Sequence, residues 1–186
     1  FIVFLVVLHQ VCASLDYHRV HYIDQYKGSN HINYLFRGNL PEQHGKFQYD
    51  TLVEDMKKKA LLEANVTLPS DFQIVIVNLL NVINYKDTNV EKEFFKKYPE
   101  KGYLVHWPII GDLIKPSEFP HSVMKYMAKH LSSWQIDDLP KTIPNLRALL
   151  EKPGNKSQVL YVHCEAGEDR TGEISGSYYM KYLNWS

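Results

Sequence analysis

Apolar runs of strand length alternate with stretches of helical periodicity along this chain, and that alternation restricts its fold more than any other feature. The runs expected to form strands are 34–40, 72–80, 103–109 and 158–162. Strands separated by helical stretches are typical of parallel sheets. The pattern therefore predicts an α/β fold with a central, mainly parallel sheet flanked by helices. With 186 residues, we expect one domain with appendages.

Helices are expected between these runs. Their predicted first residues are Thr51, Thr88, Ser117 and Thr142. The first two begin Thr-x-x-Glu patterns, which are typical of capped helix starts. The first helix should bury Leu52, Met56 and Ala60 on one face. Pro144 suits the first turn of the last helix, and Gly154 is expected to end it.

The first residues, FIVFLVVLHQVCAS, combine an apolar run too short to span a bilayer with small residues near its end. We interpret residues 1–14 as the remnant of a secretory signal, with a buried edge strand as the alternative. Three glycosylation sequons, at Asn65, Asn155 and Asn184, favour a secretory route to a secreted or lysosome-like location. No transmembrane segment is expected.

The charge balance argues against a nucleic-acid partner. Lys and Arg together number 21, and so do Asp and Glu, so no global field favours polyanions. The nine histidines show no paired spacing with carboxylates that predicts a metal site. We expect no metal and no other cofactor, and the sequence does not indicate an oligomeric state.

The segment His163-Cys-Glu-Ala-Gly-Glu-Asp-Arg-Thr-Gly172 lies between a strand-like run and a helix-compatible one. Loop amides, with the free N-H groups of a following helix, form a concave anion site. The residues expected to bind phosphate through this loop are Glu165, Ala166, Gly167, Glu168, Asp169 and Arg170. The same donors should lower the pKa of Cys164 and make it a thiolate at neutral pH.

Individual side chains in this segment have expected roles. The Arg170 guanidinium can bind the equatorial oxygens of a phosphoryl group bidentately. Gly167 can adopt a backbone conformation closed to other residues, and Gly172 should permit close approach of the helix to the sheet. The Thr171 hydroxyl can help the sulfur leave a phosphocysteine, and His163 can tune the thiolate through hydrogen bonds.

These residues resemble the signature of the protein tyrosine phosphatase superfamily: His-Cys, five residues, then Arg-Ser/Thr-Gly. The resemblance covers roughly Tyr34 to Tyr182, and residues 36–41 are similar to the entry strand of compact dual-specificity members. It implies a phosphatase domain over residues 30–186 that is incomplete after the signature helix. It also implies attack of Cys164 on phosphorus, while an aspartic acid protonates the leaving oxygen and then activates water.

The resemblance places the general acid on a loop upstream of the cysteine. Asp137 and Asp138, in Trp134-Gln-Ile-Asp-Asp-Leu-Pro140, fit that description, and Asp137 is preferred. The alternative is that this pair caps the following helix. Asp169 is a third candidate acid. Another pair, Trp107-Pro108 with Asp112, is interpreted as the end of a core strand.

The loop carboxylates make a protein phosphotyrosine or another monophosphate ester the expected substrate, because like charges disfavour polyphosphorylated headgroups. Two alternatives stay open. One is a phosphoinositide phosphatase, and the other is a pseudophosphatase that binds phosphorylated ligands without turnover.

Overall fold

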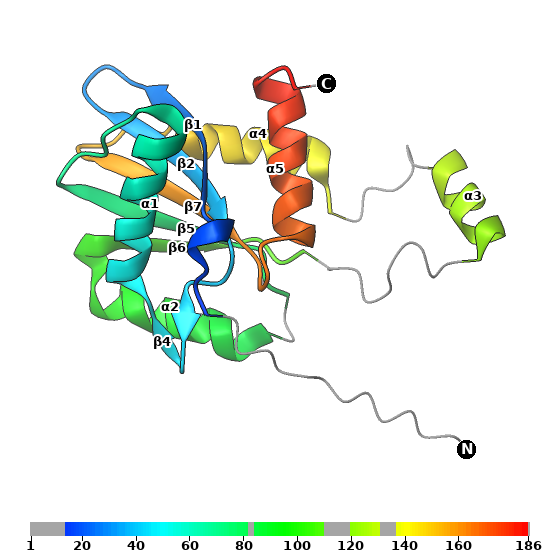
Figure 1. Cartoon of the computed structure of the whole chain (residues 1–186), viewed down its shortest axis with the longest axis horizontal. Helices are drawn as coiled ribbons and strands as arrows, with labels where there is room; N and C mark the ends of the chain where they lie inside the picture. Colours follow the sequence, from blue (N-terminus) through cyan, green and yellow to red (C-terminus); the bar gives the residue numbers. More distant parts are fainter. Residues whose placement is uncertain (1–13, 82–83, 110–119, 131–136, 186) are drawn as a thin grey trace.

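The centre of the protein is a five-stranded sheet with the strand order β1-β2-β7-β5-β6 (Figure 1). The computed structural model describes residues 14–81, 84–109, 120–130 and 137–185. β1 (His21–Lys27) pairs antiparallel with β2 (Ile32–Gly38). The remaining strands, β7 (Ser157–His163), β5 (Phe72–Asn78) and β6 (Gly102–His106), run parallel to β2. The prediction of an α/β fold with a mainly parallel central sheet is confirmed.

Helices cover both faces of this sheet, as a buried parallel sheet requires. They are α1 (Tyr49–Ala64), α2 (Tyr85–Lys97), α4 (Leu139–Leu150) and α5 (Asp169–Tyr182). α1 and α2 pack on one face, and α4 and α5 pack on the other. Successive β5 residues alternate between the two faces: Ile74 belongs to the first cluster and Val75 to the second.

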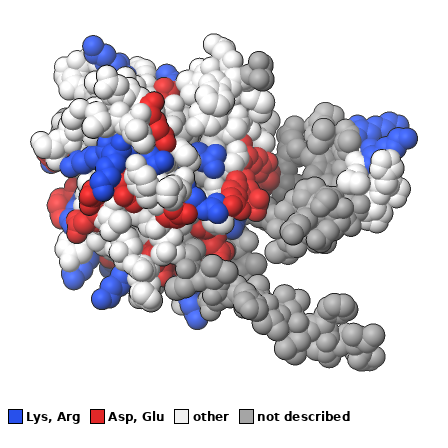
Figure 2. Space-filling view, viewed as in Figure 1, with Lys and Arg blue, Asp and Glu red and all other residues white. Residues whose placement is uncertain are grey.

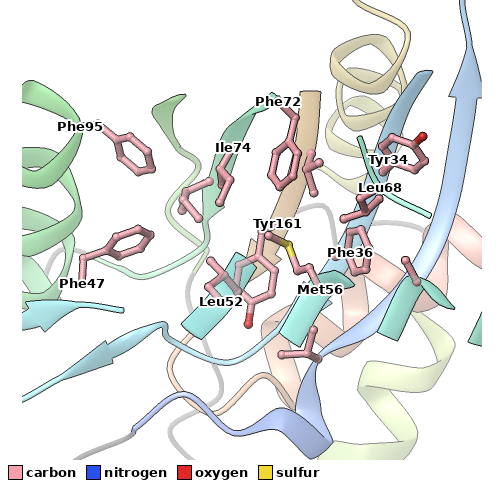
Figure 3. Packing of buried hydrophobic residues seen from close by; sticks show 14 residues of the cluster. Tyr34, Phe36, Phe47, Leu52, Met56, Leu68, Phe72, Ile74, Phe95 and Tyr161 are labelled. Carbon is pink, nitrogen blue, oxygen red and sulfur yellow. The ribbon is translucent and has the colours of Figure 1, made fainter. Parts of the chain in front are cut away.

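The first cluster joins the sheet to α1 and α2, and Figure 3 shows its side chains. Leu52, Met56 and Ala60 of α1 are fully buried in it, as the sequence predicted. Phe36 and Tyr161 meet them from β2 and β7. Burying side chains of this size stabilises the fold by about 1.5–3 kcal/mol each.

Shorter elements complete the described chain. They are η1 (Tyr17–Arg19), the hairpin strands β3 (Glu42–Gln43) and β4 (Lys46–Phe47), η3 (Pro99–Lys101) and α3 (His121–Lys129). Ser117, the predicted first residue of the third helix, lies outside the described residues. In the ranges that are described, no helix has both the length and the apolar character needed to cross a bilayer.

Two predicted helix starts are wrong by two or three residues. α1 begins at Tyr49 with Gln48 as N-cap, and α2 begins at Tyr85 with Asn84 as N-cap. Neither N-cap side chain makes a capping hydrogen bond. The Leu52 amide already donates to the Gln48 carbonyl at 2.9 Å, so the backbone is helical before Thr51 is reached.

The boundaries of α4 also differ from the prediction. The helix begins at Leu139, so Pro140 is the proline in its first turn and Pro144 lies inside the helix. The Thr142 hydroxyl donates back to the Asp137 carbonyl at 3.2 Å instead of marking the start. The helix ends at Leu150, before Gly154, and the Asn33 side-chain amide donates to the Leu150 carbonyl at 2.8 Å.

Candidate active site

The segment from 163 to 172 lies at the carboxyl end of the middle strand of the sheet. β7 ends at His163, a loop follows, and α5 begins at Asp169, as Figure 1 shows. Ligands of open α/β sheets bind outside the carboxyl ends of the strands, where connections diverge. The predicted strand-loop-helix junction is therefore present at a position suited to binding.

Cys164 is the first residue of this loop and carries a free thiol that is only 2% exposed. Burial raises the pKa of the thiol, but the Thr171 hydroxyl and amide, the Arg170 charge and the Gly167 amide together lower it below its ordinary value. A thiolate is the nucleophilic form of cysteine. The loop thus stabilises a negative charge at the sulfur, as the sequence predicted.

Gly167 gives the loop its sharp turn. Its φ is +75°, and a Cβ added there would lie 2.5 Å from the Gly38 carbonyl oxygen. Arg37 holds the same turn, because its guanidinium donates to the Gly167 carbonyl at 2.9 Å and to the Ser175 hydroxyl at 3.0 Å. The amino-terminal turns of α5 and the end of β2 therefore fix the loop between them.

Arg170 and Thr171 lie next, in the first turn of α5. The Arg170 Nη1 atom is buried and has no hydrogen-bond partner in the part of the chain that is described, whereas the Thr171 hydroxyl lies against the Cys164 sulfur. A buried donor without a partner costs about 1–3 kcal/mol. An anion held over Cys164 would satisfy the Arg170 donor, so the site is suited to an oxyanion.

Gly172 does not have its predicted role. A Cβ added at Gly172 would meet no heavy atom within 4 Å. The expectation that this glycine lets the helix approach the sheet is therefore wrong. Its amide donates to the Glu168 carbonyl at 2.7 Å, which is an ordinary helical bond that any residue except proline could make.

His163 lies beneath the loop and is fully buried. Its Nδ1 is 3.0 Å from the Cys164 carbonyl oxygen, and its Nε2 is 2.9 Å from Oε1 of Glu91, a fully buried residue of α2. The side-chain NH2 group of Asn78 donates to Glu91 Oε2 at 2.5 Å. Burial lowers the pKa of His163, but the Glu91 carboxylate raises it above its ordinary value.

Sequence reasoning missed Glu91 and Asn78 as site residues. Glu91 was considered only as part of a helix start, yet it lies four residues before Phe95, which is buried on α2. A glutamate that shares the apolar face of a helix needs a buried partner. That spacing was the available signal. Nothing in the sequence identifies Asn78 beyond its place at the end of β5.

The outer residues of the loop are acidic and open to solvent. Ala166, Glu168 and Asp169 are exposed, and Glu165 is half-buried. Glu168 forms an ion pair with Arg19 at 2.6 Å. Burial and the charge of Glu165 raise the pKa of Asp87 on α2, so these carboxylates repel one another. Figure 2 shows acidic and basic side chains interspersed over the face of the molecule that is seen in Figure 1.

The predicted acids Asp137 and Asp138 lie at the start of α4. With His106, Trp107, Pro108 and Ile109 they line a hollow of about 360 Å³, whose lining includes neither Cys164 nor Arg170. Asp138 occupies the N-cap position, but its side chain makes no capping hydrogen bond. This hollow therefore contains both predicted acids and none of the residues of the nucleophile loop.

Trp107 and Pro108 follow β6, which ends at His106. The Trp107 amide still donates to the Asn78 carbonyl at 2.9 Å, so the pair lies where the strand ends. Trp134 and Asp112 lie outside the described residues. Across the described ranges, no group of three or more His, Cys, Asp or Glu side chains could hold a metal ion.

Comparisons with known proteins give no further assignment. No protein-family model, no curated protein and no solved structure matches the chain.

Proposed function

We propose that this protein is a cysteine-dependent phosphatase of the protein tyrosine phosphatase type, which hydrolyses phosphate monoesters, with protein phosphotyrosine as the preferred substrate. The single observation that carries the proposal is the placement of buried Cys164 in a loop between β7 and α5, with Arg170 and Thr171 in the first turn of that helix. A buried cysteine whose pKa is lowered, beside a guanidinium whose buried Nη1 atom has no partner among the described residues, suits attack on a phosphoryl group.

In the first step of the proposed mechanism, Cys164 Sγ forms a bond to phosphorus while the ester P–O bond breaks. A general acid protonates the leaving oxygen. Arg170 and the loop amides bind the equatorial oxygens, where charge is concentrated in the transition state. The products of this step are the free alcohol or phenol and a phosphocysteine.

In the second step, water attacks the phosphocysteine and the same carboxylate accepts a proton from it. The P–S bond breaks, and inorganic phosphate leaves. The Thr171 hydroxyl stabilises the departing thiolate, in line with its effect on the Cys164 pKa. No metal is needed in either step.

The general acid is proposed among Asp137, Asp138 and Asp169, and Asp137 is preferred. Asp138 is the N-cap residue of α4, and Asp137 precedes it. Asp169 is exposed at the start of α5, where its negative charge also stabilises the helix through the helix dipole.

The proposal is tested by phosphate release from a phosphotyrosine peptide, from para-nitrophenyl phosphate and from phosphoinositides in parallel. Cys164→Ser should abolish turnover of every substrate but keep phosphopeptide binding. Phosphoinositide rates above the phosphotyrosine rates would select the lipid-directed alternative. Binding without turnover in the unaltered chain would select the pseudophosphatase. The absence of both binding and turnover would refute the assignment.

The acid is identified by separate Asp137→Asn, Asp138→Asn and Asp169→Asn variants. Loss of the acid should slow hydrolysis of the phosphotyrosine peptide more than hydrolysis of para-nitrophenyl phosphate, because nitrophenolate leaves without a proton. It should also remove the high-pH decline of kcat/KM, which reports deprotonation of an essential acid. A variant that shows neither effect does not carry the acid.

A further inference from the structure

A buried ion pair connects the nucleophile loop to α2. The side chains of His163 and Glu91 are both fully buried, and 2.9 Å separates Nε2 from Oε1. Burying charge is costly unless it is paired and hydrogen-bonded. A glutamate placed here on a helix whose other buried residue is Phe95 therefore needs an explanation beyond packing.

The partners of the two ring nitrogens determine the protonation state of His163. Nδ1 lies 3.0 Å from the Cys164 carbonyl oxygen, which can only accept a hydrogen bond. Nε2 faces a carboxylate oxygen, which also accepts. An ionised Glu91 carboxylate at this distance favours a hydrogen on Nε2 as well as on Nδ1, and this geometry therefore favours an imidazolium at His163.

Asn78 fixes the other oxygen of Glu91. The Asn78 Oδ1 atom accepts from the Leu80 amide at 2.7 Å, so the NH2 group of the same side chain must face away from that amide. This NH2 group donates to Glu91 Oε2. The amide orientation is thus set by the backbone, and Glu91 is held from two sides.

The other charged and titratable groups around this pair favour a cation on His163. The Tyr161 ring stacks on the imidazole with its centroid at 5.8 Å, and its hydroxyl donates to the Asn39 carbonyl. Glu42 and Asp87 lie near Glu91, and each has a pKa raised by burial first and by neighbouring carboxylates next. The Cys164 sulfur, whose pKa is lowered, lies on the loop side.

We propose that Glu91 and Asn78 are positioning residues that hold His163 as an imidazolium, and that this cation fixes the Cys164 backbone and favours the thiolate. α2 thereby contributes to the reactivity of a nucleophile that lies on another element. Glu91 touches no substrate in this proposal. The proposal rests on the proposed function only for its relevance to catalysis, because the protonation state and the thiolate can be measured without turnover.

The first test uses the unaltered protein labelled with nitrogen-15 in histidine. The chemical shifts of both His163 ring nitrogens should be those of an imidazolium well above pH 6.5, the ordinary pKa of the side chain. A neutral ring with one protonated nitrogen at pH 6.5 would overturn the proposal. This measurement needs no substitution, so it does not depend on a variant that folds.

The second test compares Glu91→Gln with Glu93→Gln, a substitution at an exposed position of the same helix. Without its anion, the buried ring should lose its extra proton, and the Cys164 thiolate should lose a neighbouring cation. We expect the pH midpoint of Cys164 alkylation by iodoacetate, followed by peptide mapping, to rise by about one unit in Glu91→Gln. Glu93→Gln should leave it unchanged.

An unchanged alkylation midpoint in a folded Glu91→Gln variant would overturn the proposal. If that variant does not fold, the nitrogen shifts of the unaltered protein decide the question alone. A chain that shows both expected results but releases no phosphate from any ester would refute the proposed function and leave this pair in place. A chain that releases phosphate while His163 is neutral would support the proposed function and refute the role of the Glu91–His163 pair.

Discussion

The inner and outer parts of the nucleophile loop are built in opposite ways. Inside, Cys164 and His163 are buried, and each is held by named partners from other elements. Outside, Glu168 and Asp169 are exposed, and the Arg19 ion pair of Glu168 is a surface contact. Buried polar networks tolerate little change, whereas exposed ion pairs contribute little to stability. On the proposed function, we expect the inner part to determine the chemistry and the outer part to influence which substrates reach it.

The largest effect on the rate should come from replacing Arg170, the cation of the inner part that is proposed to bind the ligand. Arg170→Lys keeps the charge but loses the planar, bidentate donors. Losing one transition-state donor typically lowers kcat by about 10²–10³-fold, and we expect a loss of this size in initial rates on a phosphotyrosine peptide.

The matched control for Arg170 is Arg19→Lys, which changes an arginine that pairs with Glu168 on the outer part. Its rate should stay within about twofold of the unaltered protein, since exposed pairs are worth little. Equal losses in the two variants would show that the guanidinium of Arg170 has no special role, and the contrast between inner and outer parts would fail.

The next effect concerns the turn at Gly167. Gly167→Ala should lower the free energy of unfolding by about 1–3 kcal/mol, because a side chain is strained at positive φ and its Cβ meets the Gly38 carbonyl. Phosphate binding should weaken as well. Urea unfolding followed by circular dichroism measures the stability change.

Gly176→Ala is the control for this turn, since a Cβ there would meet nothing within 4 Å in the middle of α5. Replacing a helical glycine by alanine should stabilise the protein by about 0.5–1 kcal/mol. If both variants lose stability equally, the strain at Gly167 does not hold the loop.

A smaller effect is expected from pH, through the thiolate itself. The folded-state pKa of Cys164 lies below the unfolded value of about 9, so the unfolded chain binds more protons between the two. The stabilisation is fully present above the unfolded pKa and is lost as pH falls through the folded pKa. Each unit of pKa difference corresponds to about 1.4 kcal/mol.

This pH effect is measured as the difference in unfolding free energy between the unaltered protein and Cys164→Ser. The difference should shift in favour of the unaltered protein as pH rises toward 9, because serine does not titrate in this range. A difference that stays constant with pH would show that the loop does not stabilise a thiolate.

Much of the inner part could be predicted from the sequence because its pattern is local. An apolar run, a cysteine, a glycine-containing loop and a helix start all fall within about twenty residues, and the structure has them in that order. Backbone donors of such a loop follow from its place before a helix. The four parallel strands could be predicted for the same reason, since each is marked by its own apolar run, whereas the polar strand β1 has no such run and was missed.

The contacts that support the loop could not be predicted, because they join distant parts of the chain. Arg37 and Gly167 are 130 residues apart, and the sequence shows Arg37 only as part of a strand. Glu91 reaches His163 only because β5 and β7 are neighbours in the sheet.

The smallest expected effect lies on the outer part, where Glu165 approaches Asp87. Glu165→Gln removes one negative charge near the loop without removing the Glu165 carbonyl, which accepts from the Leu40 amide at 3.0 Å. We expect KM for a soluble inositol polyphosphate to fall by about two- to fivefold relative to KM for a phosphotyrosine peptide, because exposed charges act weakly. Rates measured in parallel on both substrates give this ratio.

The control for Glu165→Gln is Glu100→Gln, which changes an exposed acid in η3. Because η3 precedes β6, Glu100 lies at the amino ends of the parallel strands, opposite the loop. It should leave the KM ratio unchanged. In about 1 M salt the Debye length is about 3 Å, so the effect of Glu165→Gln should disappear there if it acts through charge. An effect that persists in high salt would mean that Glu165 acts through the shape of the loop. The outer part would then help to fix the loop, a role given above to the inner part alone.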